Sequence, residues 1–294
     1  MRNKRVKTNS FKRLLEHPFM LVTLIIFVIY LASLFYIVVL GFMNSLKELG
    51  DIYVNRFGLP RLWAFINYIK AFTNLYVDIL PYRYFLPQLL FNSLIYSVGS
   101  VAVSTCSTCA CAYLFNKYKC KLGDFLYNVY LVLMIIPIVG NVGSGLAFAQ
   151  AIGTYDNLIF QFYSMISFTS NPLIFYAAWS GVSKDYMEAA FIDGAGHWRT
   201  MVTIMWPMIN VIFTIQCITR FIPTWNDYMT PMTYLPSFPT AAYALFRFSG
   251  DNYFAGQIPL RMAASMLLCI PCIALFLIFK KKMLGNLSLG GIKG

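Results

Sequence analysis

The sequence predicts an all-α polytopic membrane protein with six transmembrane helices, and three observations support this fold class. Apolar residues make up 59% of the 294 residues, above the ~45–50% of soluble domains. Charged residues make up only 12%, about half the usual ~25%, which is too few to cover a soluble globule of this length. The charges also lie between long uncharged stretches, and about 20 apolar residues are enough to span a bilayer. The same composition excludes a disordered chain.

Six uncharged stretches are each long enough for one spanning helix. They are residues 17–46, 84–116, 125–155, 157–183, 200–219 and 262–279. The first stretch follows a basic start, but it exceeds the ~7–15 apolar residues of a signal peptide, so we predict a retained helix. A further uncharged stretch, 228–246, contains Pro231, Pro236 and Pro239. Each proline removes a backbone N–H donor from a helix, and lipid offers no replacement for it, so we predict a loop there.

The positive charges predict the orientation of the chain. Fifteen Lys and Arg residues lie in the two tails and in loops 116–124 and 181–205, which six spans place on one side of the membrane, whereas six lie on the other side. Since cytoplasmic loops carry the excess of positive charge, both termini are expected in the cytoplasm. The net charge of +12 therefore reflects topology and does not call for a nucleic-acid partner. The aromatic segment 44–85 is expected outside, as an interfacial helix or a small cap.

The loop between the fourth and fifth stretches carries local structural signals. Residues 185–192 are predicted to form two helical turns, with Asp185 as the N-cap and Glu188 completing a capping box. Gly194 follows at a position suited to a left-handed C-cap. The chain is then expected to restart as the helix that leads through Pro207 into the membrane. A short exposed helix is marginally stable alone, so this one is expected to need a partner.

This loop resembles a known motif. Glu188-Ala189-Ala190 and Gly194, followed by Ile204 and Pro207, resemble the EAA motif of the membrane subunits of bacterial ABC importers. The string from Glu188 to Gly196 is similar to the form found in carbohydrate-importer permeases of the maltose-permease type. The likeness covers nearly the whole chain and includes Asn44-Ser45-Leu46-Lys47, Asn92-Ser93-Leu94, Met134-Ile135-Ile136-Pro137, Trp225-Asn226-Asp227-Tyr228 and Gly290-Gly291-Ile292-Lys293-Gly294. Trp206 departs from the leucine usual in that family, and Gly196 stands where serine is common.

The resemblance implies a type I ABC importer permease fold in a bacterial cell membrane. Its implied partners are a second homologous permease subunit, two cytoplasmic ATPase subunits that hold ATP and Mg, and an extracytoplasmic substrate-binding protein. ATP hydrolysis on the partner subunits would drive alternating access for a carbohydrate. The residues expected to couple this chain to the ATPase are Asp185, Glu188, Ala189, Ala190, Asp193 and Gly194. The implied division is a tail at 1–17, a first helix at 18–43, the outer segment 44–85, a core permease domain at 86–282 containing the coupling loop 181–205, and a tail at 283–294.

The fifth stretch is unusually polar for a span. Ionisable residues at membrane depth are costly, at ~2.5–3.5 kcal/mol each, so they are expected to face a bundle interior or a wet path. Amide, carboxylate and aromatic groups also suit sugar hydroxyls. The candidate substrate path consists of Asn171, Arg220, Trp225, Asn226 and Asp227. The alternative role for the fifth-stretch residues is structural, at the outer interface or between the two permeases, and the alternative for Asn171-Pro172 is a helix kink.

The chain itself is expected to hold no catalytic, cofactor or metal site. No Gly-x4-Gly-Lys-Ser/Thr loop is present to bind ATP phosphates. Cys106, Cys109 and Cys111 lie within a span with no His, Asp or Glu nearby, and Cys269 and Cys272 follow no βαβ pattern. Three alternative functions stay open: a permease for a non-sugar solute, a secondary ion-coupled transporter, and a membrane enzyme. The sequence shows neither the internal repeats typical of secondary transporters nor a catalytic constellation.

Overall fold

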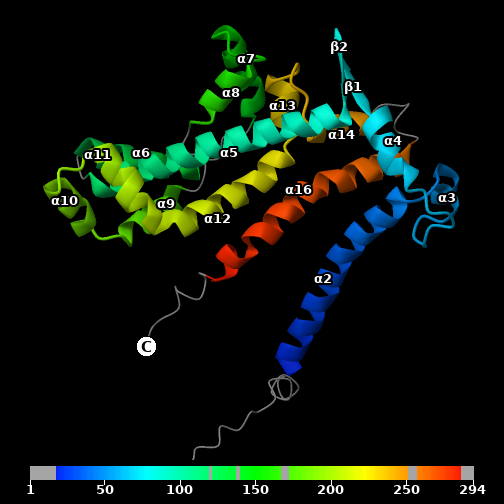
Figure 1. Ribbon diagram of the computed structural model, residues 1–294, viewed down its shortest axis with the longest axis horizontal. Helices are drawn as coiled ribbons and strands as arrows, with labels where there is room; N and C mark the ends of the chain where they lie inside the picture. Colours follow the sequence, from blue (N-terminus) through cyan, green and yellow to red (C-terminus); the bar gives the residue numbers. More distant parts are fainter. Residues whose placement is uncertain (1–17, 119–120, 137–139, 167–171, 251–256, 286–294) are drawn as a thin grey trace, which may run out of the picture.

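The long helices lie side by side and determine the shape of the molecule (Figure 1). The computed structural model describes residues 18–118, 121–136, 140–166, 172–250 and 257–285. Helix α5 (Leu86–Lys117) is the central element, since it packs against both α12 (Trp206–Trp225) and α9 (Pro172–Ser180). Helix α16 (Ile258–Gly285) packs against α12 and against α2 (Pro18–Ser45), which diverges from the other helices toward its N-terminus (Figure 1).

Four of the six predicted spans are confirmed as single helices. The helices long and apolar enough to cross a membrane are Pro18–Ser45, Leu86–Lys117, His197–Trp225 and Ile258–Lys280. The most apolar window of the first has none of its residues buried in this chain, against 44% for the second. Helix α2 therefore presents its side chains to lipid or to another subunit, whereas α5 is a core helix.

The third and fourth predicted spans are each divided between two shorter helices. Region 125–155 contains most of α6 (Lys121–Ile135) and all of α7 (Asn141–Ala151), and region 157–183 contains α8 (Leu158–Ser164) and α9. The prediction of one continuous helix in each region is therefore wrong. The N-cap of α7 is Gly140 in a left-handed conformation, with φ at 77°, and α8 ends at Ser164, after which Met165 and Ile166 are not helical. Pro137 and Asn171 lie outside the described residues.

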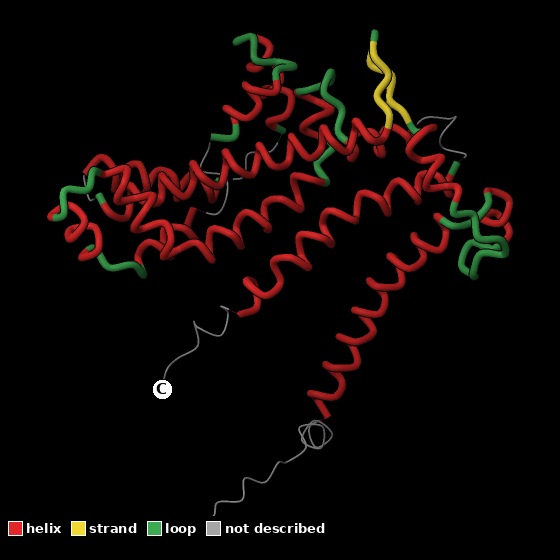
Figure 2. Tube along the Cα trace, in the orientation of Figure 1, coloured by secondary structure: helices red, strands yellow, loops and turns green. Residues whose placement is uncertain are grey.

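A small cap covers one end of the helices. It comprises α3 (Leu49–Val54), α4 (Ile66–Asn74), β1 (Tyr76–Ile79) and β2 (Tyr82–Phe85). The strands pair antiparallel, from Tyr76 opposite Phe85 to Ile79 opposite Tyr82, and they are the only strands in the described part of the chain (Figure 2). The fully buried Lys47 donates from Nζ to the carbonyl oxygen of Asn55 at 2.6 Å, and burial lowers the pKa of its ammonium group. The small-cap alternative is thus confirmed, although the hairpin was not predicted.

The proline-containing segment 228–246 is also helical, which corrects the predicted loop. It holds α13 (Met229–Tyr234) and most of α14 (Ala241–Gly250). Pro231 is the third residue of α13, where the missing N–H has no partner within the helix in any case. Pro236 and Pro239 lie between the two helices. The prolines therefore limit the lengths of these helices without preventing them.

Buried apolar clusters lie toward the two ends of α5. The cluster beside the cap joins α4, the hairpin, α14 and α16 through residues such as Leu75, Leu86, Phe248 and Ala263. The cluster at the opposite end contains Cys109, Tyr113, Phe175, Trp179 and Met205. This second cluster supports the loop that carries the predicted coupling residues.

Candidate coupling site and substrate path

The predicted short helix is confirmed as α10 (Asp185–Ile192), but its N-terminal cap is not the predicted one. Its N-cap residue is Lys184, which makes no capping side-chain hydrogen bond, so Asp185 is the first helical residue. The N–H of Asp185 instead donates to Oγ of Ser183 at 3.2 Å. The predicted N-cap is therefore one residue too late. Asp185 and Glu188 interact favourably with the helix dipole from inside the first turn as well, so the sequence did not distinguish Asp185 as the cap from Asp185 as the first helical residue.

The C-terminal end of α10 has the predicted left-handed turn. Gly194 has a φ of 79°, a conformation that costs other residues free energy because of their Cβ. Its N–H donates to the carbonyl of Phe191 at 3.0 Å, and the N–H of Ala195 donates to that of Ala190 at 2.9 Å. These two bonds form a Schellman motif. The motif reverses the chain and ends α10 sharply.

The chain then re-enters the bundle as one continuous helical run. It comprises α11 (His197–Arg199), the π-helical segment η1 (Thr200–Met205) and α12. Pro207 is the second residue of α12 and has no N–H for the preceding turn. The π-helical segment lies immediately before it, and such segments are frequent at functional sites.

One face of α10 is fixed to the bundle. Met187 and Ala190 are buried, at 8% and 3% exposed, and the Tyr113 hydroxyl lies 3.6 Å from the Met187 sulfur. His197 packs edge-on against Phe191 with ring centroids 4.8 Å apart, and its Nδ1 lies 2.6 Å from the hydroxyl of Tyr118. An aromatic series thus connects α10 to the end of α5.

A buried lysine fixes the segment that leads into α10. Lys117, the last residue of α5, is only 4% exposed. Its Nζ donates to the carbonyl oxygens of Trp179 at 2.7 Å and Val182 at 2.5 Å. These carbonyls lie at and just beyond the C-terminal end of α9, where a helix has unpaired acceptors and a partial negative charge. Sequence analysis missed this role, because the acceptors lie more than 60 residues away and the only local signal was a charge at the end of an apolar stretch.

The opposite face of α10 is exposed. Asp185, Glu188, Ala189 and Asp193 are all open to solvent. Two large apolar side chains accompany them: Ile192 is 86% exposed and Trp198 is 74% exposed. Of the six predicted coupling residues, five therefore lie on or beside this open face, while Ala190 faces the bundle.

The predicted path residues at the C-terminal end of α12 have three different environments. Trp225 is 2% exposed, stacks on Phe221 with centroids 5.6 Å apart, and donates from Nε1 to the carbonyl of Leu268 at 3.0 Å. Asn226 is exposed, and its amide donates to the carbonyl of Ile222 at 2.9 Å. Asp227 accepts the N–H of Thr230 at 3.1 Å and the Tyr96 hydroxyl at 3.5 Å.

The remaining two path residues are Arg220 and Asn171. The Nε of Arg220 is buried and has no hydrogen-bond partner among the described residues. A cationic side chain at membrane depth is expected to face a wet path or a partner's carboxylate. Asn171 lies outside the described residues. The described part of the chain also contains no group of three or more His, Cys, Asp or Glu residues able to hold a metal ion.

Known proteins resemble this chain in sequence and in fold. A family model described as a binding-protein-dependent transport system inner membrane component matches residues 105–283. The diacetylchitobiose uptake system permease protein NgcG of Streptomyces coelicolor is 26% identical over 258 residues, which cover 84% of this chain and 80% of that protein. The melibiose/raffinose/stachyose import permease protein MelC of Bacillus subtilis is 26% identical over 263 residues, which cover 85% and 88% of the two chains.

The fold has a counterpart among solved structures. The crystal structure of a bacterial ABC transporter involved in the import of the acidic polysaccharide alginate contains a chain that superposes with a TM-score of 0.74. The match covers 90% of this chain and 95% of that one, at 19% sequence identity.

Proposed function

The chain belongs to the family of binding-protein-dependent transport system inner membrane components, and we propose that it is the permease subunit of an importer that carries a carbohydrate. The observation that carries this proposal is the α10 surface: a two-turn helix fixed on one face and open on the other, with exposed apolar side chains. The sugar specificities in the names of the relatives support the substrate class.

The open face of α10 receives a cytoplasmic ATPase subunit in this proposal. Ile192 and Trp198 are the apolar anchors, and Glu188 and Asp193 are the charged rim. ATP and Mg bind to that subunit, which hydrolyses the nucleotide, and the aromatic series from Phe191 to Tyr113 transmits the resulting motion to α5. Gly194 keeps α10 at a fixed angle to the helix that follows.

The other partners contact different parts of the chain. A second permease subunit covers exposed faces of the spans and supplies a carboxylate for Arg220, whose Nε is otherwise unpaired among the described residues. Asn226 and Asp227 border the sugar path, while Trp225 holds the end of α12 in place. A substrate-binding protein delivers the sugar from outside.

Co-purification tests the docking proposal. Ile192→Asp places a charge in the apolar anchor without disturbing a buried side chain, so the ATPase should be lost from the purified complex. Phe57→Asp is the matched control, because Phe57 is 68% exposed in the cap at the other end of the molecule. Retention of the ATPase by Ile192→Asp, with normal uptake, would contradict this assignment.

Labelling tests the orientation. Single cysteines at positions 50–80 should react with an impermeant maleimide in intact cells, and those at 184–200 should not.

Sugar uptake into inverted and right-side-out vesicles distinguishes the proposed ATP-driven importer from the alternative, a secondary ion-coupled transporter. Uptake driven by an ion gradient without ATP would identify a secondary transporter instead.

A further inference from the structure

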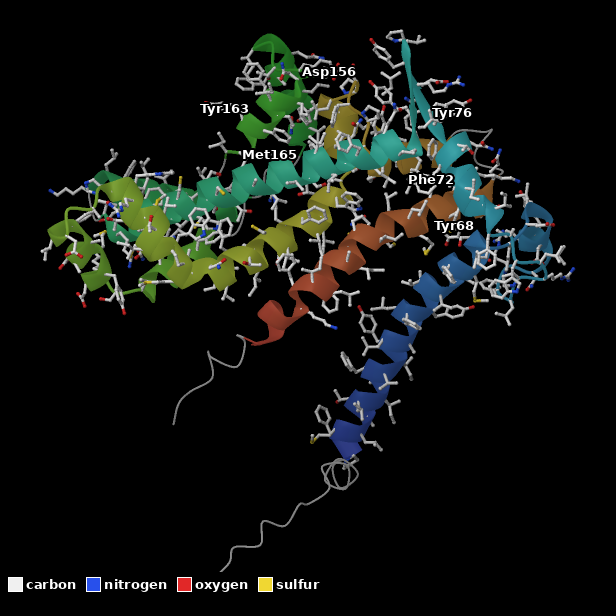
Figure 3. All side chains as sticks on the ribbon, viewed as in Figure 1. Tyr68, Phe72, Tyr76, Asp156, Tyr163 and Met165 are labelled. Atoms are coloured by element: carbon white, nitrogen blue, oxygen red, sulfur yellow. The ribbon has the colours of Figure 1, made fainter. Side chains whose placement is uncertain are left out.

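Helices α7, α8 and α13 enclose a cavity that the sequence analysis did not anticipate. Its volume is about 820 Å³, within the ~300–1,000 Å³ of small-molecule sites. Its wall includes Thr230, whose N–H donates to the Asp227 carboxylate just after the end of α12. The cavity therefore lies close to the C-terminal end of α12. Figure 3 shows Tyr163 and Met165, two wall residues, on the same side of α5 as Asp156.

The wall combines aromatic faces with hydrogen-bonding groups. Phe148, Tyr163 and Tyr234 supply rings, and Gln161 and Thr230 supply an amide and a hydroxyl. The Tyr163 side chain is 69% exposed, so its ring is open to an incoming molecule. None of the described wall residues is charged. Rings and uncharged polar groups match the apolar faces and hydroxyls of sugar rings.

Hydrogen bonds beside the cavity connect α13 and the residues after it to α7 and to the turn between α7 and α8. The N–H of Asp156 donates to the carbonyl of Tyr234 at 2.9 Å, and its Oδ1 accepts the N–H of Ser237 at 3.0 Å. Asp156 adopts a φ of 58°, which is uncommon outside glycine and occurs where the surrounding structure holds it. The Tyr234 hydroxyl also donates to the carbonyl of Val142 at 3.4 Å. These bonds hold α13, which supplies Thr230 and Tyr234 to the wall, against the helices that form the rest of the wall.

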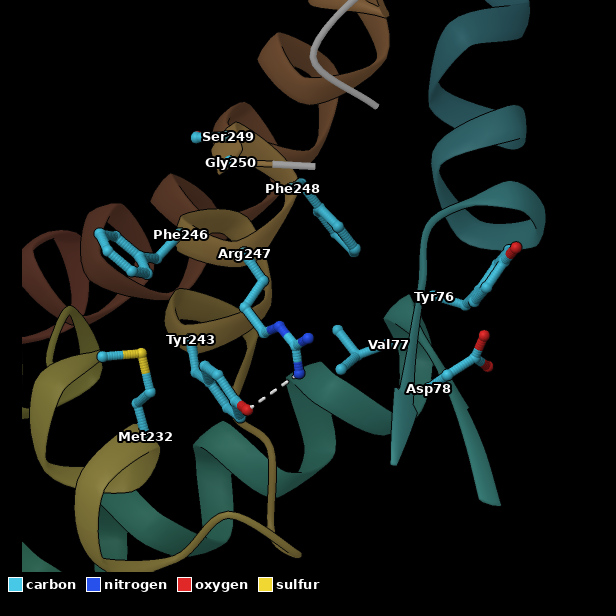
Figure 4. Close-up of a pocket in the computed structure, with 10 residues that line it drawn as sticks. All are labelled: Tyr76, Val77, Asp78, Met232, Tyr243, Phe246, Arg247, Phe248, Ser249 and Gly250. Carbon is cyan, nitrogen blue, oxygen red and sulfur yellow. Dashed lines mark hydrogen bonds between the residues drawn. The ribbon is translucent and has the colours of Figure 1, made fainter. Parts of the chain in front are cut away.

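A second cavity of similar size provides a chemical contrast. It measures about 850 Å³ and lies between β1 and α14 (Figure 4). Its wall includes Asp78, which forms an ion pair with Arg83 at 2.7 Å, and Arg247, which donates to the Tyr243 hydroxyl at 3.4 Å. Charged groups thus line the cavity beside the hairpin and are absent from the described wall of the cavity between α7, α8 and α13.

We infer that the cavity between α7, α8 and α13 binds an uncharged oligosaccharide on its way through the importer, an inference that rests on the proposed carbohydrate function. An acidic sugar entering it would lose hydration from its carboxylates without meeting a cation in the described wall, which is unfavourable. A neutral sugar exchanges its water for Gln161, Thr230 and the aromatic faces. The chain thus differs in substrate charge from its alginate-importing structural counterpart.

A competition uptake assay on the complete importer tests the inference. Cells carrying this chain with its partner subunits receive diacetylchitobiose, maltotriose, raffinose and an alginate trisaccharide at equal concentration, and cell extracts are analysed by mass spectrometry. We expect one or more of the neutral sugars to accumulate. Gln161→Leu and Tyr163→Leu should each raise the concentration for half-maximal uptake by about fivefold, the effect of one lost hydrogen bond or ring contact.

Matched controls separate the cavity from general damage to the fold. Ile159→Ala changes a residue of α8 that is 77% exposed and outside the wall, and Tyr155→Leu removes a ring from the adjoining turn. Both should leave uptake within twofold of the parent. Normal uptake in both Gln161→Leu and Tyr163→Leu overturns the site but leaves carbohydrate import standing. Uptake of the alginate trisaccharide alone overturns the uncharged class, and uptake of none of the four sugars overturns the carbohydrate function together with the site.

Discussion

The proposed coupling loop and the C-terminal end of α12 differ in how they place their large side chains. At the loop, Ile192 and Trp198 extend into solvent from a helix that is fixed from behind. At the end of α12, Trp225 is enclosed by Phe221 and Leu268, and the polar residues that follow it remain accessible. The first region exposes apolar surface, which we propose another subunit covers, and the second buries an aromatic residue within its own chain. An indole ring in such a sequence is thus compatible with either role, and its exposure decides between them.

This difference determines where a substitution acts. A change on the open face of α10 removes only the contact proposed for the assembled importer, so the isolated chain should remain folded. A change at Trp225 opens a cavity in the chain itself. Stability of the single subunit and function of the assembly should therefore respond differently at the two ends.

The largest effect on stability is expected from Trp225→Ala. It deletes a side chain that is 2% exposed and removes the hydrogen bond to the carbonyl of Leu268, so the free energy of unfolding should fall by about 3–5 kcal/mol. Thermal unfolding of the purified subunit in detergent measures the loss. Trp198→Ala is the matched control, since Trp198 is 74% exposed and its truncation should leave the midpoint unchanged. Equal midpoints for the two variants would remove the contrast between the regions.

The second effect is expected from Lys117→Met, which tests the support beneath the coupling loop. Methionine keeps the length of the side chain but leaves the carbonyls of Trp179 and Val182 without their donor. Unsatisfied buried acceptors cost about 1–3 kcal/mol, and the loss should appear both in thermal unfolding and in uptake. Lys121→Met, at an exposed position of α6, should change neither. Wild-type stability in Lys117→Met would mean that water replaces the ammonium group.

The third effect concerns Gly194→Val, and it separates strain from crowding. No atom lies within 4 Å of a Cβ placed at Gly194, so the penalty comes from the positive φ alone, at about 1–2 kcal/mol. That strain should tilt α10, dissociate the ATPase and lower uptake at least tenfold while the protein still inserts in the membrane. Gly196→Val is the control, because Gly196 has a φ of −71° and equally open surroundings. If both variants transport normally, the angle of α10 does not matter for coupling.

The two regions also differ in how well sequence could predict them. The limits of α10 and the left-handed turn at Gly194 follow from neighbouring residues, since a helix and its C-cap are encoded within about one turn. The environment of Trp225 depends on Leu268, 43 positions further along, and no local pattern encodes that contact. The candidate path therefore grouped Trp225 with Asn226 although only the second is exposed.

The number of helices shows the same limit at a larger scale. Uncharged length predicted the four long helices, because crossing a bilayer sets a minimum apolar length. It could not show that the third and fourth stretches are divided, since the division depends on backbone conformation at single positions such as Gly140. It also missed the cavity between α7, α8 and α13, which exists only because α13 returns to the α7–α8 turn at Asp156.

The smallest effect is expected from Asn226→Ala, and it sharpens the contrast within the motif itself. The Asn226 amide is exposed and bonds only to the carbonyl of Ile222 within its own turn, so its loss should change the free energy of unfolding by less than about 0.5 kcal/mol. If the amide also meets the passing sugar, uptake should fall about two- to fivefold at unchanged protein level, the effect of one hydrogen bond. Asn128→Ala, at an exposed position of α6, controls for loss of a surface amide. Because Trp225→Ala and Asn226→Ala alter adjacent residues, a stability loss in the first with an uptake loss in the second would assign the two roles separately. A stability loss in both would instead make the end of α12 a structural element throughout, and the sugar path would then begin at Asp227 and Thr230.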